Sequence, residues 1–262
     1  MGLSGQDLTR VAAAAAVLAL IASASGTLAE EPVEAASVES MFDVAFGIAV
    51  TTNYVARGIT QTEDKPAAQG YVELDAGSFY ANAWTSNVSF GGSPDTEVDL
   101  AVGWAPEFGK LSLDLGYVHY VYLSDIPGLA FGEAYATADF AATDNITIGA
   151  QAYYAPNYAL SGTAAHYVEA NADITLPHDL GVSGALGYQT FDPAYGTSYV
   201  TWNAGAYWQM NDYTKLDLRY TDTGLSTADC AALMGTAGTE CGAKVMLSLS
   251  VDLVGSDFGG GN

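Results

Sequence analysis

From Asp43 onward, apolar and polar residues alternate with a period of two in segment after segment, and this alternation constrains the fold more than any other feature. In 97–105, one face carries Val98, Leu100, Val102 and Trp104, while the other face is polar or small. The segments 164–176 and 243–254 repeat the pattern. Such a period indicates strands with two different faces, and no long segment has helical periodicity. The sequence therefore predicts an all-β protein.

About twelve strands are expected. Their ranges are 42–57, 68–76, 79–88, 97–105, 110–122, 131–141, 145–155, 164–176, 180–190, 198–209, 214–222 and 243–254. A tilted strand needs roughly ten residues to cross the hydrocarbon core of a bilayer, and bacterial single-chain barrels have even strand numbers. Both the lengths and the number fit a membrane barrel.

The connections between these strands alternate in length. Short turns are expected at 76–78, 106–109, 142–144, 177–179 and 210–213, and the longest loops at 58–67 and 223–242. Short periplasmic turns and longer extracellular loops are typical of outer-membrane barrels. We therefore predict a transmembrane, antiparallel, up-and-down β-barrel in the bacterial outer membrane. The alternative is a secreted soluble β-sandwich or lipocalin-like barrel whose apolar face is a core; small outward residues such as Ala134, Ala136 and Ala138 favour lipid contact instead.

The chain divides into four expected parts. Residues 1–29 have the layout of a signal peptide, with Arg10 before an apolar run that is too short to span a bilayer. A short acidic segment, 30–41, follows, then the barrel at 42–254 and a C-terminal tail at 255–262. A signal peptide implies secretion, so Cys230 and Cys241, which lie close together, are expected to form a disulfide.

Charge limits the partners. The net charge of −23 argues against nucleic acid, because phosphate binding requires clustered Lys and Arg. Two thiols without a nearby His make an incomplete zinc site, and we expect no metal or other cofactor. The expected partners are outer-membrane lipid and small hydrophilic solutes or cations, and assembly into a homo-oligomer stays open.

The region 51–88 carries a specific set of residues around the first two strands. They are Tyr54, Arg57, Gly58, Ile59, Thr60, Gln61, Pro66, Ala67, Gln69, Gly70, Phe79, Tyr80 and Trp84. In these residues the region resembles the TorF-like family of outer-membrane porins. Ala56 stands where that family usually has an aromatic residue, and the chain ends in SDFGGGN instead of a terminal aromatic strand residue. The resemblance implies an outer-membrane barrel and a channel, and it implies no particular substrate.

If the apolar faces contact lipid, the polar faces line the lumen. The pore-lining candidates are Asn53, Arg57, Glu73, Asp75, Asp99, Asp114, Glu133, Asp139, Glu169, Asp173, Asp217 and Arg219. Acidic side chains dominate this set, and rings of acidic groups favour cations in a narrow aqueous channel. The sequence therefore suggests a weakly cation-selective pore. Strand alternation points Arg57 inward near the outer mouth, where it would either form a constriction or pin the first loop by ion pairing.

Two other classes of function compete with a channel. Catalysis is not expected, because His119, His166 and His178 stand in no recognisable Ser and His motif and the chain has no GxSxG sequence. A closed barrel that acts as a structural or adhesion protein is the alternative to a channel. In that case the loop at 223–242, with its two cysteines, is the candidate partner contact or plug.

Overall fold

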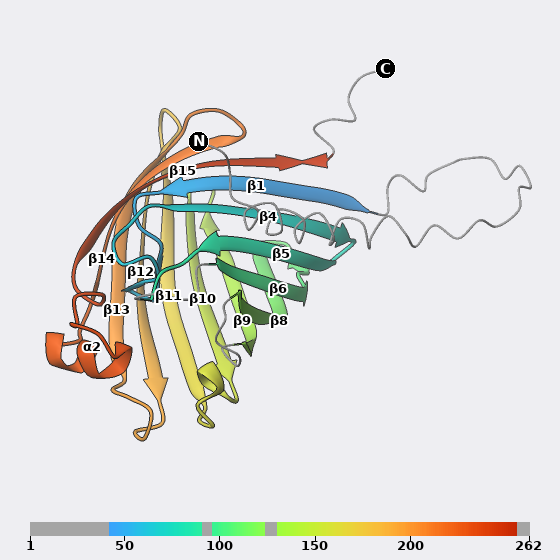
Figure 1. Cartoon of the computed structure of the whole chain (residues 1–262). Coiled ribbons are helices and arrows are strands. Elements are labelled where there is room, and N and C mark those ends of the chain that lie inside the picture. The colour runs from blue at the N-terminus through green and yellow to red at the C-terminus, as the bar shows by residue number, and fades with distance from the viewer. Residues whose placement is uncertain (1–41, 91–95, 124–129, 256–262) are drawn as a thin grey trace, which may run out of the picture. The chain divides into compact units, whose positions relative to one another are not determined.

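The computed structural model describes residues 42–90, 96–123 and 130–255, and these form a closed antiparallel barrel of twelve long strands (Figure 1). The long strands are β1 (Asp43–Thr51), β4 (Ala67–Ala76), β5 (Phe79–Asn87), β6 (Thr96–Trp104), β8 (Leu111–Leu123), β9 (Phe131–Thr143), β10 (Ile146–Ala155), β11 (Ala165–Leu176), β12 (Leu180–Phe191), β13 (Tyr199–Gln209), β14 (Thr214–Thr223) and β15 (Lys244–Val254). Each strand pairs with its neighbour in the chain, β15 pairs with β1, and β6 pairs with β8. The ring of hydrogen bonds is therefore continuous, and no long strand is left as an edge.

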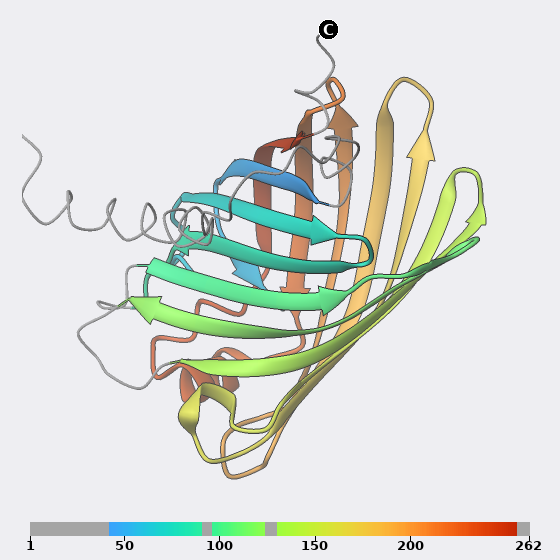
Figure 2. The same cartoon turned by 90° about the vertical axis from the view of Figure 1, so that its right-hand side faces the viewer.

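The predicted fold class is confirmed. Eleven of the long strands begin and end within two residues of the expected positions. Figure 2 shows the teal and green strands in front of the orange ones, as two opposite walls of the barrel. The first strand is the exception, because β1 ends at Thr51 and not at residue 57.

The outer face of the barrel is apolar. Large apolar side chains in the middle of strands are widely exposed, with 67% of Ile48, 60% of Leu186 and 53% of Leu218 accessible. Two bands of exposed aromatic side chains flank this surface. One contains Phe79, Trp104, Phe108, Trp208 and Tyr213; the other contains Tyr117, Tyr154, Tyr188, Trp202 and Tyr220. An apolar surface between aromatic girdles is the form of a transmembrane barrel.

The two ends of the barrel differ. One end carries the short connections 77–78, 105–110, 144–145, 177–179 and 210–213, of which 105–110 holds the two-residue strand β7 (Glu107–Phe108). The other end carries the longer loops, including 52–66, 156–164 with the 3-10 helix η2 (Tyr158–Leu160), and 224–243. Among the described residues, no helix is long and apolar enough to cross a membrane.

The loop 224–243 is a folded element at the long-loop end. It contains α2 (Thr227–Met234), capped by Ser226 and ended by Gly235, and the predicted disulfide Cys230–Cys241 is present. Both cysteines are buried in a small apolar cluster with Ile59 and Tyr199. The expected signal peptide and acidic segment, and the tail beyond Gly255, lie outside the described residues.

Candidate channel lumen

The loop 52–66 folds into the barrel as a hairpin. Its strands are β2 (Val55–Ala56) and β3 (Ile59–Thr60), which pair with each other and not with the wall. Arg57 and Gly58 form the turn, and both have positive φ (50° and 81°), as a tight two-residue hairpin turn requires. The prediction that Arg57 and Asn53 belong to the first wall strand is therefore wrong. Thr52 and Asn53 interrupt the strand, and the chain turns inward.

Arg57, at the tip of this hairpin, is bound by groups on four wall strands. Its Nη2 and Nη1 atoms donate to the two carboxylate oxygens of Glu133 on β9, at 2.5 and 3.0 Å. Nη1 also donates to Gln189 on β12, at 3.1 Å. The guanidinium lies over the rings of Tyr153 (β10) and Tyr167 (β11), at 4.9 and 4.7 Å from their centroids. These contacts fix a cation inside the lumen.

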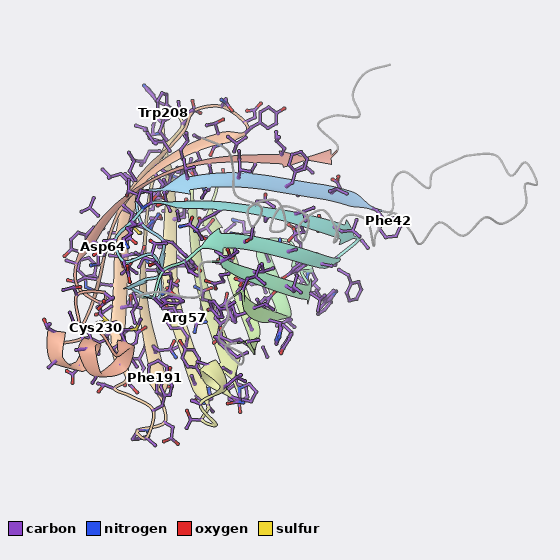
Figure 3. The ribbon with its side chains drawn as sticks, viewed as in Figure 1. Phe42, Arg57, Asp64, Phe191, Trp208 and Cys230 are labelled. Carbon is purple, nitrogen blue, oxygen red and sulfur yellow. A yellow bond between two sulfur atoms is a disulfide. The ribbon has the colours of Figure 1, made fainter. Side chains whose placement is uncertain are left out.

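The hairpin therefore crosses the lumen. It leaves the wall between β1 and β4, whereas β9 and β12 lie on the far side of the ring in the strand order. Figure 3 shows Arg57 within the ring of strands. Glu133 and Gln189 are each only 1% exposed, so the tip of the hairpin packs tightly against the far wall at this level.

Burial alone would lower the pKa of the Arg57 guanidinium. The charge and the hydrogen bonds of Glu133 act in the opposite direction and outweigh it, so the pKa lies above its ordinary value. Arg57 is therefore positively charged at every pH in which the barrel folds.

Further contacts hold the hairpin along its length. The Tyr199 hydroxyl on β13 donates to the backbone oxygen of Arg57 at 3.1 Å, and the Thr60 N–H donates to the oxygen of Glu240 at 3.1 Å. Asn53, which is buried, accepts hydrogen bonds from Thr60 and Thr62. Asn53 thus shapes the base of the hairpin. Ile59 joins the hairpin to the disulfide-closed loop 224–243 through their shared apolar cluster.

A cavity of about 290 Å³ lies against the hairpin tip, inside the barrel. Val55, Arg57 and Gly58 line it from the hairpin. The wall contributes Gln151, Glu169, Asn203 and Arg219 together with Tyr120, Tyr153 and Tyr167. These polar and aromatic groups lie on the inner faces of β8, β10, β11, β13 and β14, so this space is a section of the lumen.

Arg219 and Glu169 are each held by polar neighbours on the wall. Arg219 donates to both carboxylate oxygens of Asp217, at 3.2 and 2.8 Å, and also to Asn203 and Ser183. Glu169 accepts from Gln151 at 2.6 Å and from the Tyr167 hydroxyl at 2.5 Å.

Between this level and the short-turn end, the polar faces carry mostly carboxylates. Asp114 accepts from Tyr80, Asp173 from Tyr207 and Glu73 from Asn82. Asp75 and Asp139 lie on the same alternating faces as Glu73 and Glu133. Lys215 lies on the inward-alternating face of β14, two residues before Asp217. We call this acidic stretch of the inner face, between the cavity and the short-turn end, the acidic vestibule.

Asp99 lies apart from the cavity, on β6, next to Glu97. Each has a buried carboxylate oxygen, Oδ1 of Asp99 and Oε2 of Glu97, with no protein partner among the described residues. The other oxygen of Glu97 accepts from Tyr122 at 3.3 Å. This pair belongs to the same acidic face as the other carboxylates.

Sequence reasoning missed the uncharged partners of Arg57, namely Gln189, Tyr153, Tyr167 and Tyr199. Strand alternation predicts that each of these side chains points inward. It does not predict that they contact Arg57, because they lie 96 to 142 positions away from it in the sequence. The histidines do not converge. His119 stacks on Tyr117 and His166 on Tyr154, while His178 lies in a short turn. The absence of catalysis stays a prediction.

The family model described as "Bacterial protein of unknown function (Gcw_chp)" matches residues 35–250. The chain belongs to the Gcw_chp family. No curated protein sequence matches it. The resemblance to TorF-like porins is not tested by this match and stays a prediction.

Solved structures share the fold of this Gcw_chp chain. One, described as "KdgM porin", has a TM-score of 0.53 at 8% identity, over 80% of this chain and 98% of that chain. A second, "KdgM porin in complex with disordered oligogalacturonate", has a TM-score of 0.53 at 9% identity, over the same shares. At such identities the likeness concerns the fold alone. A closed barrel with an apolar belt, in a bacterial family, is located in the outer membrane, with the short turns in the periplasm.

Proposed function

We propose that the protein is a porin-like channel for the passive diffusion of small hydrophilic solutes or ions, with weak cation selectivity. The observation that carries this proposal is the inner face of the barrel. It is mostly polar, it lines the cavity at the hairpin tip, and it carries the carboxylates of the acidic vestibule. A barrel with a purely structural role could fill its interior with packed side chains.

Cation selectivity would come from the vestibule. Carboxylates that face a narrow aqueous space between low-dielectric walls attract cations and repel anions. At the level of the cavity, the positive charges of Arg57 and Arg219 offset part of the negative charge of the inner face. Selectivity is therefore expected to be weak.

The alternative is a closed barrel with a structural or adhesion role. The hairpin that crosses the lumen favours it, because the Arg57–Glu133 contact is buried. The loop 224–243, with α2 and the disulfide, would then be the exposed contact surface.

Single-channel current in a planar bilayer distinguishes the two functions. The purified, refolded protein would be measured in symmetric salt and then in a salt gradient. Steady conductance, with a reversal potential whose sign shows that cations permeate more readily than anions, supports the proposed channel. A folded but silent barrel supports the alternative, and a reversal potential on the anion side refutes the selectivity.

A further inference from the structure

We infer that the cavity at the hairpin tip is a binding site for one small, hydroxylated carboxylate, such as a sugar acid. The inference deepens the proposed function, on which it rests in one respect: the solute has to enter the lumen. It concerns a single site and its ligand, whereas the proposed function concerns passage through the barrel.

The first observation is that two of the three charged side chains that line the cavity are arginines. Arg57 and Arg219 line it together with one carboxylate, Glu169. The carboxylates that pair with the two arginines, Glu133 and Asp217, are not among the lining residues, and their side chains are 2% and 18% exposed. In an otherwise acidic lumen, this level presents cations to a solute.

The second observation is that each guanidinium group has N–H donors that form no hydrogen bond with the described residues. An arginine has five N–H donors in a planar fork. Arg57 uses three of them, for Glu133 and Gln189, and Arg219 uses four, for Asp217, Asn203 and Ser183, within the described residues. The side chains of Arg57 and Arg219 are 20% and 23% exposed. Both can therefore donate to a carboxylate without losing their protein partners.

The third observation concerns the rest of the ligand. Gln151 and Asn203 offer amide groups, and the carboxylate of Glu169 can accept from a hydroxyl group. Tyr120, Tyr153 and Tyr167 add ring surface. A polyhydroxylated ligand needs both donors and acceptors beside apolar surface, as this lining provides. The volume of about 290 Å³ lies at the lower end of the range of small-molecule sites, which is roughly 300–1,000 Å³, so it fits one monosaccharide unit.

The test is calorimetric titration of the folded, full-length barrel in detergent micelles with glucuronate, and with glucose as the uncharged counterpart. The inference predicts that glucuronate binds at one site per barrel and that glucose binds about tenfold more weakly or not at all, because it lacks the charge-assisted bonds. Equal binding of the two sugars, or no binding of glucuronate by a folded barrel, would overturn the inference.

Variants locate the site. Arg219→Gln is expected to weaken glucuronate binding by about tenfold or more, and Arg219→Lys, which keeps the charge, by less. The matched control is Lys215→Gln, which removes one positive charge from the same face of β14 but from outside the cavity. It should leave binding unchanged. A control that weakens binding as much as Arg219→Gln would show that only the overall charge matters and would overturn the site.

Conductance separates this result from the proposed function. A conducting barrel that does not bind glucuronate refutes the site and leaves the channel intact. A silent barrel that binds glucuronate supports the site and refutes the channel.

Discussion

Replacement of Arg57 by Ala tests whether the hairpin is held in the lumen by its tip. The substitution removes three hydrogen bonds to Glu133 and Gln189 and two ring contacts. It also leaves the Glu133 carboxylate, which is almost fully buried, without its cation. Loss of one partner of a buried ion pair costs about 3–5 kcal/mol, because the remaining charge is uncompensated.

The variant can relieve this cost by moving the hairpin away, so that water reaches Glu133. The ratio of hairpin-in to hairpin-out barrels should then fall by roughly 200- to 5,000-fold. We expect a higher single-channel conductance and stronger cation selectivity than in the wild type. Amide hydrogen exchange should also accelerate at Gln61, whose N–H donates to Tyr54 inside the hairpin. The wall strands should keep their protection, because their ladders do not include Arg57.

A double-mutant cycle gives the control. Arg57→Ala combined with Glu133→Gln leaves no uncompensated charge at this contact, so the double variant should regain part of the stability that Arg57→Ala loses. Unchanged conductance and unchanged exchange in Arg57→Ala would refute the idea that this ion pair holds the hairpin. Additive effects of the two substitutions would refute the coupling between the residues.

Three further predictions concern the hairpin, the disulfide and the outer face. Gly58→Ala should displace the hairpin and raise conductance, because Gly58 has positive φ and a Cβ atom there would collide with Thr201 and Thr223; Gly77→Ala, with positive φ but open space, is the matched control and should not change conductance. Reduction of Cys230–Cys241 should destabilise the loop 224–243 by about 3 kcal/mol in the chain-entropy model, seen as faster proteolysis of that loop while the wall stays intact; equal proteolysis rates would contradict this. Leu186→Lys should reduce the free energy of unfolding in lipid by about 2–4 kcal/mol, measured by denaturant titration. Ala185→Lys, at a position that faces the lumen, should reduce it much less. Equal reductions would argue against lipid contact at Leu186.

The strands of the barrel wall could be predicted from the sequence, because the pattern that specifies each strand lies within that strand and its flanking turns. The period of two fixes which face of each strand meets lipid, and turn residues fix where the strands end. This is why the ends of β4 to β15 lie so close to the expected positions. The disulfide could also be predicted, since its two cysteines lie close together in the sequence of a chain expected to be secreted.

The interior could be predicted only in part. Alternation continues past Thr51 to Arg57, so the sequence pattern does not show that the chain leaves the wall. Arg-Gly is also a weaker turn signal than Asn-Gly or Asp-Gly. The partner of Arg57, Glu133, is 76 residues away, and only the closed ring brings the two together. The hypothesis that Arg57 holds the first loop in place by ion pairing agrees with the Arg57–Glu133 contact. Strand alternation did not predict the hairpin that brings Arg57 to Glu133.

The most direct test of the central account asks whether current flows through this lumen. The two native cysteines are joined to each other, so an introduced cysteine is the single free thiol. Met246 lines the cavity, and its neighbour Leu247 faces outward. With Met246→Cys, a charged, water-soluble thiosulfonate reagent should reduce the single-channel current in one step, and with Leu247→Cys it should have no effect. A current that the reagent leaves unchanged in Met246→Cys would contradict the account, because the ions would then pass by another route.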